Sequence, residues 1–233
     1  GASTRMIGGL IMTHSDDDGL VLPPKIASAH VVLLPIYRGD DQRQQVLDYT
    51  TGLAKALGEC RYHGGALRVE IDDSDRGGAR TWNWIKKGIP LRVEIGPRDI
   101  AADAVMVARR DQLPRDKASY TRQRFVGEVV SVLDDIQNLL FKRAMAYRQA
   151  HTHSIDDEVE FYRFFTPENQ SKPEIHGGFA MAHWCGSADC EAKIKDDLTV
   201  TIRCIPFESP CESGQCICCG GESGQRVVFA KAY

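Results

Sequence analysis

Seven of the eight cysteines lie in the C-terminal part of the chain, at spacings that could hold a metal ion. Cys185 and Cys190 form one short-spaced pair, and a strand-like segment separates them from the run Cys216-Ile217-Cys218-Cys219-Gly220. Two such pairs suit a tetrahedral thiolate site, because each pair can supply two sulfurs from one tight turn. Four protein ligands leave no coordination position open for a substrate. The spacing therefore predicts a structural zinc site that holds a small domain together.

The same cysteines allow two other interpretations. A disulfide cluster would require an oxidising compartment, which no other feature of the chain indicates. A redox protein would use the thiols between Cys216 and Cys219, and metal analysis would separate this function from a zinc site. We expect Cys60, Cys204 and Cys211 to pack as small apolar residues.

The composition is that of a globular protein with room for two domains. The chain has 233 residues, of which 42% are apolar and 26% charged. A net charge of -3 argues against a general nucleic-acid binder. Residues 98–124 nevertheless carry seven Lys/Arg and four Asp/Glu, so a polyanion would bind the middle of the chain. No apolar run is long enough for a transmembrane helix and no secretory pattern opens the sequence, so we expect a cytoplasmic location.

Apolar segments of strand length alternate with helical patterns between residues 29 and 120. Strands separated by helices imply a sheet with helical crossovers, so this region predicts an α/β domain with a mixed sheet and flanking helices. We expect strands at 30–37, 67–71, 91–95 and 104–108, helices at 44–57 and 81–87, and a turn at 96–99.

A long helix follows, with Thr121 as its expected N-cap. Its apolar positions step by four or three residues and form one continuous stripe. The stripe consists of Phe125, Val129, Leu133, Ile136, Leu140 and Ala144. The helix either connects the α/β domain to the cysteine-bearing segment or belongs, in its first half, to the α/β core.

The remaining segments complete the expected domain organisation. The aromatic run at 161–165 predicts a core, with a base-stacking surface as the alternative. Strands are expected at 198–202 and 227–229, flanking the cysteines. The apolar run at 6–12 fits a strand or a helix equally well. We expect an opening segment at 1–28, the α/β domain at 29–120, a connecting helix at 121–152 and a smaller α+β zinc-binding domain at 153–233.

Several motifs resemble those of class II prolyl-tRNA synthetases of the archaeal/eukaryotic type. Residues 3–24, from Ser-Thr-Arg to Pro-Pro, resemble motif 3 and the exit from the catalytic domain. The segments HVVLLPIYR, LRVEID, KGIPLRVEIGPRD and VMVARRD resemble the anticodon-binding domain. The segments HWCGSADC, IRCIPF and QCICCG and the final FAKAY resemble the zinc-binding C-terminal domain. The resemblance covers nearly the whole chain in the order of the family and implies its C-terminal portion.

The resemblance also implies roles for individual residues. Arg5 matches the motif 3 arginine that binds the phosphate region of ATP, where a planar guanidinium suits an oxyanion, and Ser3 falls at a nucleotide-contacting position. Tyr233 matches a terminal tyrosine that reaches towards the active site. The zinc ligands would be Cys185, Cys190, Cys216 and Cys219, with Cys218 as the alternative to Cys219.

Charged residues at the ends of two strands match the positions that face the second and third anticodon bases. Arginine can pair bidentately with guanine and a carboxylate can accept from an exocyclic amine, provided that the bases are unpaired. The alternative for each residue is a solvated surface charge. The matching residues are Glu94, Arg98, Asp99, Arg109, Arg110 and Asp111.

The function implied by the resemblance is that of part of a proline–tRNA ligase. The complete enzyme would use ATP and Mg²⁺ to join proline to tRNA(Pro), and would be a homodimer. Nothing in the chain resembles motif 1 or motif 2, so we expect this portion to be inactive alone. The alternative is a non-catalytic tRNA-binding or interaction module on the same α/β fold.

Overall fold

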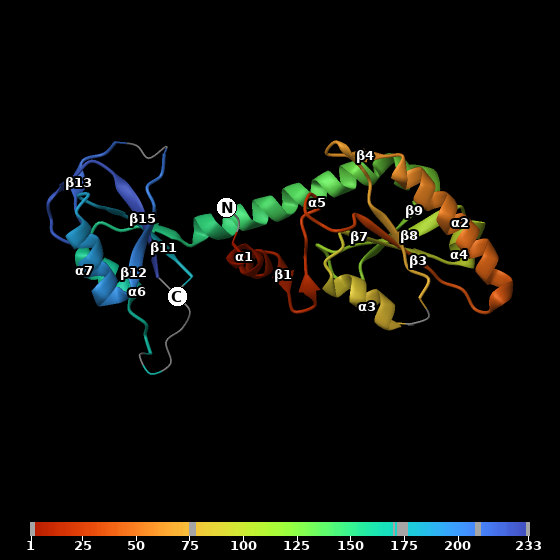
Figure 1. Cartoon of the computed structure of the whole chain (residues 1–233), viewed down its shortest axis with the longest axis horizontal. Helices are drawn as coiled ribbons and strands as arrows, with labels where there is room; N and C mark the ends of the chain where they lie inside the picture. Colours follow the sequence, from red (N-terminus) through yellow and green to blue (C-terminus); the bar gives the residue numbers. More distant parts are fainter. Residues whose placement is uncertain (1–2, 75–77, 170, 172–176, 208–210, 232–233) are drawn as a thin grey trace. The chain divides into compact units, whose positions relative to one another are not determined.

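The computed structural model divides into two compact units, Gly1–Ala144 and Met145–Tyr233 (Figure 1). It describes residues 3–74, 78–169, 171, 177–207 and 211–231. Within these ranges, no helix is long and apolar enough to cross a membrane.

The first unit is built on a five-stranded mixed sheet in the order β6-β3-β7-β8-β9. The central strand β3 (Val31–Pro35) pairs in parallel with β6 (Val69–Ile71) and β7 (Leu91–Ile95). β8 (Ala104–Arg109) is antiparallel to β7, and β9 (Lys117–Thr121) is antiparallel to β8. All five residues of β3 are buried, as expected for an apolar strand with both faces covered. The predicted mixed sheet is confirmed, with β9 as an added edge strand.

Helices cover both faces of this sheet. α2 (Asp40–Gly58) and α5 (Arg122–Ala150) share a core with one set of alternating strand residues, and α4 (Pro97–Ala101) packs beside α2. α3 (Gly78–Lys86) lies on the opposite side of the sheet (Figure 1). There its Trp84 packs against a core that contains Val32 and Leu34 of β3. The alternation of the strands thus supplies two apolar faces, one for each helical layer.

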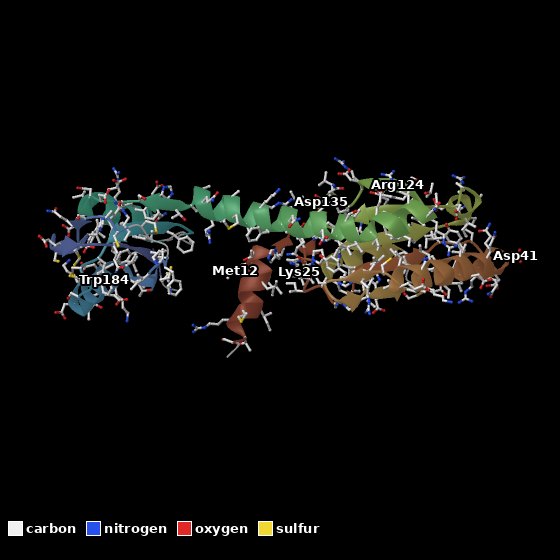
Figure 2. All side chains as sticks on the ribbon, turned by 90° about the horizontal axis from the view of Figure 1, so that it is seen from above. Met12, Lys25, Asp41, Arg124, Asp135 and Trp184 are labelled. Atoms are coloured by element: carbon white, nitrogen blue, oxygen red, sulfur yellow. The ribbon has the colours of Figure 1, made fainter. Side chains whose placement is uncertain are left out.

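The apolar stripe of α5 forms part of the first unit's core. Phe125, Val129, Leu133, Ile136 and Leu140 are all buried. Thr121 caps the helix, because its Oγ1 accepts a hydrogen bond of 3.3 Å from the Arg124 backbone N–H. Arg124 and Asp135 mark the course of this helix in Figure 2. The first half of α5 is therefore a core helix of the α/β unit.

The ambiguous apolar run near the N-terminus is a helix, α1 (Arg5–Thr13), without a buried residue. Met12 is labelled on this helix in Figure 2, and its side chain is 70% exposed. A short hairpin, β1 (Ser15–Asp16) and β2 (Gly19–Leu20), follows and packs on the end of α3. Gly19 has a φ of +128°, and a Cβ there would lie 2.5 Å from the Lys86 Cα, so only glycine permits this approach.

The second unit contains a four-stranded sheet in the order β10-β11-β15-β12. Its core includes Phe161 and Phe165, which are fully buried, so the prediction of a core role for the aromatic run is confirmed for these two. The elements are β10 (Thr152–Ser154), α6 (Glu158–Phe165), β11 (Phe179–His183), α7 (Ala188–Leu198), β12 (Val200–Cys204) and β15 (Arg226–Lys231).

Some local expectations are wrong, for identifiable reasons. Residues 97–101 form the short helix α4 where we expected a turn, because Asp99 caps the backbone of Gly96. Cys204 and Cys211 are exposed, so they do not pack as small apolar residues, whereas Cys60 does pack against the core. Two hairpins were too short to leave a periodic pattern. They are β4 (Arg61–Tyr62) with β5 (Gly65–Ala66), and β13 (Gly214–Gln215) with β14 (Glu222–Ser223).

Candidate nucleic-acid interface and metal centre

The six charged residues predicted to face bases lie at opposite ends of the sheet. Glu94 is in β7, and Arg98 and Asp99 follow in α4, just beyond the carboxyl end of that strand. β8 runs antiparallel to β7, and its last residue Arg109 pairs with Leu91, the first residue of β7. Arg109, Arg110 and Asp111 therefore form a separate group. The structure does not bring the six together.

Arg98 is the exposed member of the group at the carboxyl end of β7. Glu94 is 19% exposed, and both of its carboxylate oxygens accept from Lys117 Nζ, at 2.7 and 2.6 Å. Asp99 Oδ2 accepts from the Gly96 backbone N–H at 2.8 Å, so its carboxylate stabilises the loop. Arg98 is therefore exposed on α4, which shares the α2 face of the sheet, whereas Glu94 pairs with Leu34 on the α3 face and is held there by Lys117.

The group after β8 has its charges neutralised within the protein. Arg109 donates to Asp111 at 3.0 and 2.8 Å and to Asp135 at 2.6 Å, and the Asp111 side chain is fully buried. The hydrogen bonds to Asp111 raise the pKa of Arg109 further above its usual value. The ion pairs of Arg109 with Asp111 and Asp135 therefore hold the loop after β8 against α5.

Arg110 points away from Arg109 and is 3% exposed. Its two terminal nitrogens bind both oxygens of Asp16 at 2.7 and 2.5 Å, and its Nε donates to the Ile85 carbonyl at 3.1 Å. The hydrogen bonds from Arg110 lower the pKa of Asp16. This fork joins the N-terminal hairpin, the end of α3 and the end of β8.

The four cysteines predicted as ligands come together in the second unit. One Sγ from each of Cys185, Cys190, Cys216 and Cys219 lies within 4.8 Å of the others. The Sγ atom of Cys185 is 3.7 Å from that of Cys190 and 3.8 Å from that of Cys219. A tetrahedral ion with metal–sulfur bonds of about 2.3 Å requires sulfur–sulfur separations of about 3.8 Å. These thiols can hold a metal ion, and their separations are too long for disulfide bonds.

Two tight turns position these sulfurs. Cys185 precedes Gly186, whose φ of +88° bends the chain into α7, where Cys190 lies in the first turn. Cys216 and Gly220 close the second turn through a 2.9 Å hydrogen bond from the Gly220 N–H to the Cys216 carbonyl. The two turns are tied together, since the Ile217 N–H donates to the His183 carbonyl at 3.0 Å.

The electrostatics of the cluster favour a thiolate at Cys216. Burial raises the pKa of Cys216, but hydrogen bonds from the backbone of Cys218, Cys219 and Cys185 outweigh it and lower the pKa to about 7. Burial raises the pKa of Cys190. A bound cation would offset the unfavourable charge of several thiolates. Cys218 is not among the four gathered residues and packs against the apolar core.

The remaining predicted residues lie near the chain ends. Arg5 begins α1 and is exposed, as is Ser3, whose Oγ accepts from the Arg5 backbone N–H at 3.3 Å. Tyr233 lies outside the described residues. Sequence reasoning missed Asp16 and Lys117, the partners of Arg110 and Glu94, because each lies far along the chain from the residue that it binds.

Two family models match the chain, one for each unit. Residues 30–131 match "Anticodon binding domain", and residues 169–233 match "Prolyl-tRNA synthetase, C-terminal". The chain belongs to the prolyl-tRNA synthetase family. Its two units correspond to the C-terminal portion of that family, as the motifs predicted.

Curated relatives agree with this assignment. "Proline--tRNA ligase 2" of Anaeromyxobacter dehalogenans is 49% identical over the whole chain, which covers 46% of that protein. "Proline--tRNA ligase" of Protochlamydia amoebophila is 47% identical and that of Bdellovibrio bacteriovorus 45%, again over the whole chain and 46% of each relative. The chain thus spans about half the length of these prolyl-tRNA synthetases.

Proposed function

We propose that this chain is the tRNA-binding portion of a proline–tRNA ligase, and that its first unit binds the anticodon of tRNA(Pro). The observation that carries the proposal is the match of residues 30–131 to an anticodon-binding domain. The exposed Arg98 and the oriented Glu94, at one end of the sheet, supply a guanidinium and a carboxylate. These groups suit the edges of guanine and of an exocyclic amine on unpaired bases.

The contacts support different roles for the six candidate residues. Glu94 and Arg98 would meet bases, and Asp99 would hold the loop that presents Arg98. Arg109, Arg110 and Asp111 have their charges paired inside the protein. Their expected part in tRNA binding is to position the loop after β8; a base could take their hydrogen bonds only after breaking these pairs.

The second unit is proposed to bind one structural Zn²⁺ through Cys185, Cys190, Cys216 and Cys219. The support is the sulfur–sulfur separations of 3.7 and 3.8 Å and the all-thiolate donor set. Zinc would supply cohesion between the two turns. The fold of the turns would then depend on the metal.

The complete enzyme would activate proline with ATP and Mg²⁺ and transfer it to tRNA(Pro). Ser3 and Arg5 would contribute to its ATP site, and Tyr233 would approach the active site. This chain alone is expected to be inactive, since it carries only the motif 3 edge of that site. Two properties of the complete enzyme remain predictions: that it is a homodimer and that it is cytoplasmic. The domain division of this chain at 1–28, 29–120, 121–152 and 153–233 also remains a prediction.

The alternative is a non-catalytic tRNA-binding or interaction module on the same fold. It predicts the same anticodon affinity but no contribution to aminoacylation. Adding this chain to the family's catalytic portion and measuring prolyl-tRNA formation separates the two functions. No gain in aminoacylation, with anticodon binding intact, would favour the module.

Binding of labelled anticodon stem-loops, measured by fluorescence anisotropy, tests the proposal. Changing the second or third anticodon base should weaken binding by about 1–3 kcal/mol per base. Arg98→Ala should remove this discrimination at one base. Arg124→Ala is the matched control, because that arginine is exposed on α5, where it pairs with Glu128 and lies over the Tyr120 ring. Equal affinity for every anticodon would leave only attraction to phosphates and would overturn the proposal.

A further inference from the structure

The parallel strands β3 and β6 end at a crevice that none of the roles assigned so far uses. Its volume is about 340 Å³, and its lining includes Ile36, Tyr37, Asp73, Ser74 and Thr81. These residues follow the carboxyl ends of β3 and β6 or begin α3.

The chain topology explains why a crevice opens there. The connection from β3 to β6 passes through α2 on one face of the sheet, and the connection from β6 to β7 passes through α3 on the other. The loops that leave β3 and β6 therefore diverge to opposite faces. In open α/β sheets, ligands bind in crevices outside the carboxyl ends of the strands.

Hydrogen bonds fix the shape of this crevice. Arg80 joins its two sides, because Nη2 donates to the Pro35 carbonyl at 2.8 Å and Nη1 donates to the Asp72 carbonyl at 3.0 Å. The Tyr37 hydroxyl donates to Asp73 Oδ1 at 2.5 Å, and Arg43 donates to Asp73 Oδ2 at 2.7 Å. The Tyr37 ring is consequently held by its polar edge.

The chemistry of the lining suits a nucleobase better than a phosphate. The Ile36 side chain is 45% exposed and offers apolar surface, and the partly buried Tyr37 ring, with the Arg43 guanidinium 5.9 Å from its centroid, adds an aromatic edge to the lining. Thr81 offers a hydroxyl for the edge of a base, and each Asp73 oxygen, which accepts one hydrogen bond from Tyr37 or Arg43, retains a lone pair for another. A phosphate would require exposed cationic donors, but Arg43 binds a carboxylate, the terminal nitrogens of Arg80 bind backbone carbonyls, and Arg80 Nε is buried.

The crevice adjoins the loop that carries Arg98. The Ile36 N–H donates to the Ile95 carbonyl at 2.8 Å, and the Ile36 carbonyl lies 3.5 Å from where a Cβ on Gly96 would stand. We infer that the crevice receives a further unpaired base of the anticodon loop, next to the base that Arg98 meets. This inference rests on the proposed anticodon-binding function.

Stem-loops with a single abasic site at each loop position test the inference on the full chain. In the wild type, one abasic position outside the bases met by Glu94 and Arg98 should weaken binding about tenfold, the contribution of one stacked base. Ile36→Ala, and Thr81→Phe, which fills the crevice, should each weaken binding of the intact stem-loop by about the same factor. In both variants, the abasic change at that position should cost nothing further.

Ile71→Ala is the matched control, because Ile71 is 40% exposed at the end of β6 but does not line the crevice. It should bind every stem-loop as the wild type does. Wild-type affinity for both crevice variants, or a loss that is the same at every abasic position, would overturn the inference. Discrimination of the second and third anticodon bases in the same wild-type assay reports separately on the proposed function.

Discussion

Removing the charge of Asp16 should loosen the N-terminal hairpin from the α/β unit. Asp16→Asn keeps the size of the side chain and an oxygen for the Asp18 backbone N–H, which donates to Asp16 at 3.0 Å. It removes the negative charge that Arg110 binds with both terminal nitrogens. Arg110 is 3% exposed, so water cannot fully replace the lost partner.

The expected loss of stability is about 2 kcal/mol. Breaking a fully buried ion pair by removing one partner costs about 3–5 kcal/mol, and a hydrogen bond to a charged group contributes about 1.5–3 kcal/mol. Asp16 is 47% exposed, and the bond from Arg110 to the Ile85 carbonyl remains. The loss should therefore lie in the range for a hydrogen bond to a charged group, below that for a fully buried ion pair. Asp17→Ala, in the same hairpin and exposed, is the control and should change stability little.

Hydrogen exchange in increasing urea, followed by mass spectrometry, measures each unit separately. Exchange of residues 78–95 reports on the first unit and that of residues 179–204 on the second, and only the first should respond. The pKa of Asp16 is lowered in the folded state, so its contribution is fully present above the unfolded value of 3.8 and is lost as the pH falls through the folded value. The wild type and Asp16→Asn should therefore begin to converge below about pH 4 and become equal once the pH is below the folded pKa of Asp16.

Two results would refute this reasoning. Equal stability of wild type and Asp16→Asn at neutral pH would mean that the ion pair does not hold the hairpin. A difference that persists unchanged to pH 3 would mean that the effect of the substitution has another origin than the ionised carboxylate.

Three further predictions concern the metal centre, the loop after β8 and the tRNA. Cys190→Ser should lower zinc content measured by atomic absorption and destabilise the second unit alone, whereas Cys218→Ser should retain about one zinc per chain. Arg109→Ala should destabilise the first unit in urea by about 3 kcal/mol, because the buried Asp111 carboxylate loses its partner; unchanged stability would contradict the pairing. Stem-loop affinity should fall steeply between about 50 and 200 mM salt, while the preference for the cognate anticodon persists.

Periodicity was sufficient to predict the main elements of the first unit. Alternation at 91–95 and the apolar run at 30–37 gave β7 and β3, because buried strands leave a pattern in any short window. β9 was missed, since its sequence Lys-Ala-Ser-Tyr-Thr is mostly exposed at the sheet edge and its alternation rests on Ala118 and Tyr120 alone. Edge strands are defined by their hydrogen-bond partner, which lies elsewhere in the chain.

The candidate sites depend on contacts between residues far apart in the chain, which local sequence patterns do not predict. Spacing predicted the cysteine pairs, but the choice between Cys218 and Cys219 depends on which sulfur the second turn directs towards Cys185. Adjacent arginines are indistinguishable in sequence, yet Arg110 becomes buried through a partner 94 positions away. Local pattern cannot report such pairings.

The opposite orientation of Arg109 and Arg110 decides how the two ends of the sheet can act. Successive side chains at the end of β8 point to opposite sides. Arg109 therefore binds Asp111 and, on α5, Asp135, whereas Arg110 binds Asp16 in the hairpin. The end of β8 therefore joins the sheet to α5 and to the N-terminal hairpin, and the guanidinium donors of both arginines are occupied by these contacts. Recognition of a base there would first have to break a buried ion pair. The end that carries Arg98 needs no such rearrangement, and it continues into the crevice beside Ile36. Base-specific contacts are therefore expected at the carboxyl ends of β7, β3 and β6, while the residues at the end of β8 hold α5 and the hairpin against the sheet.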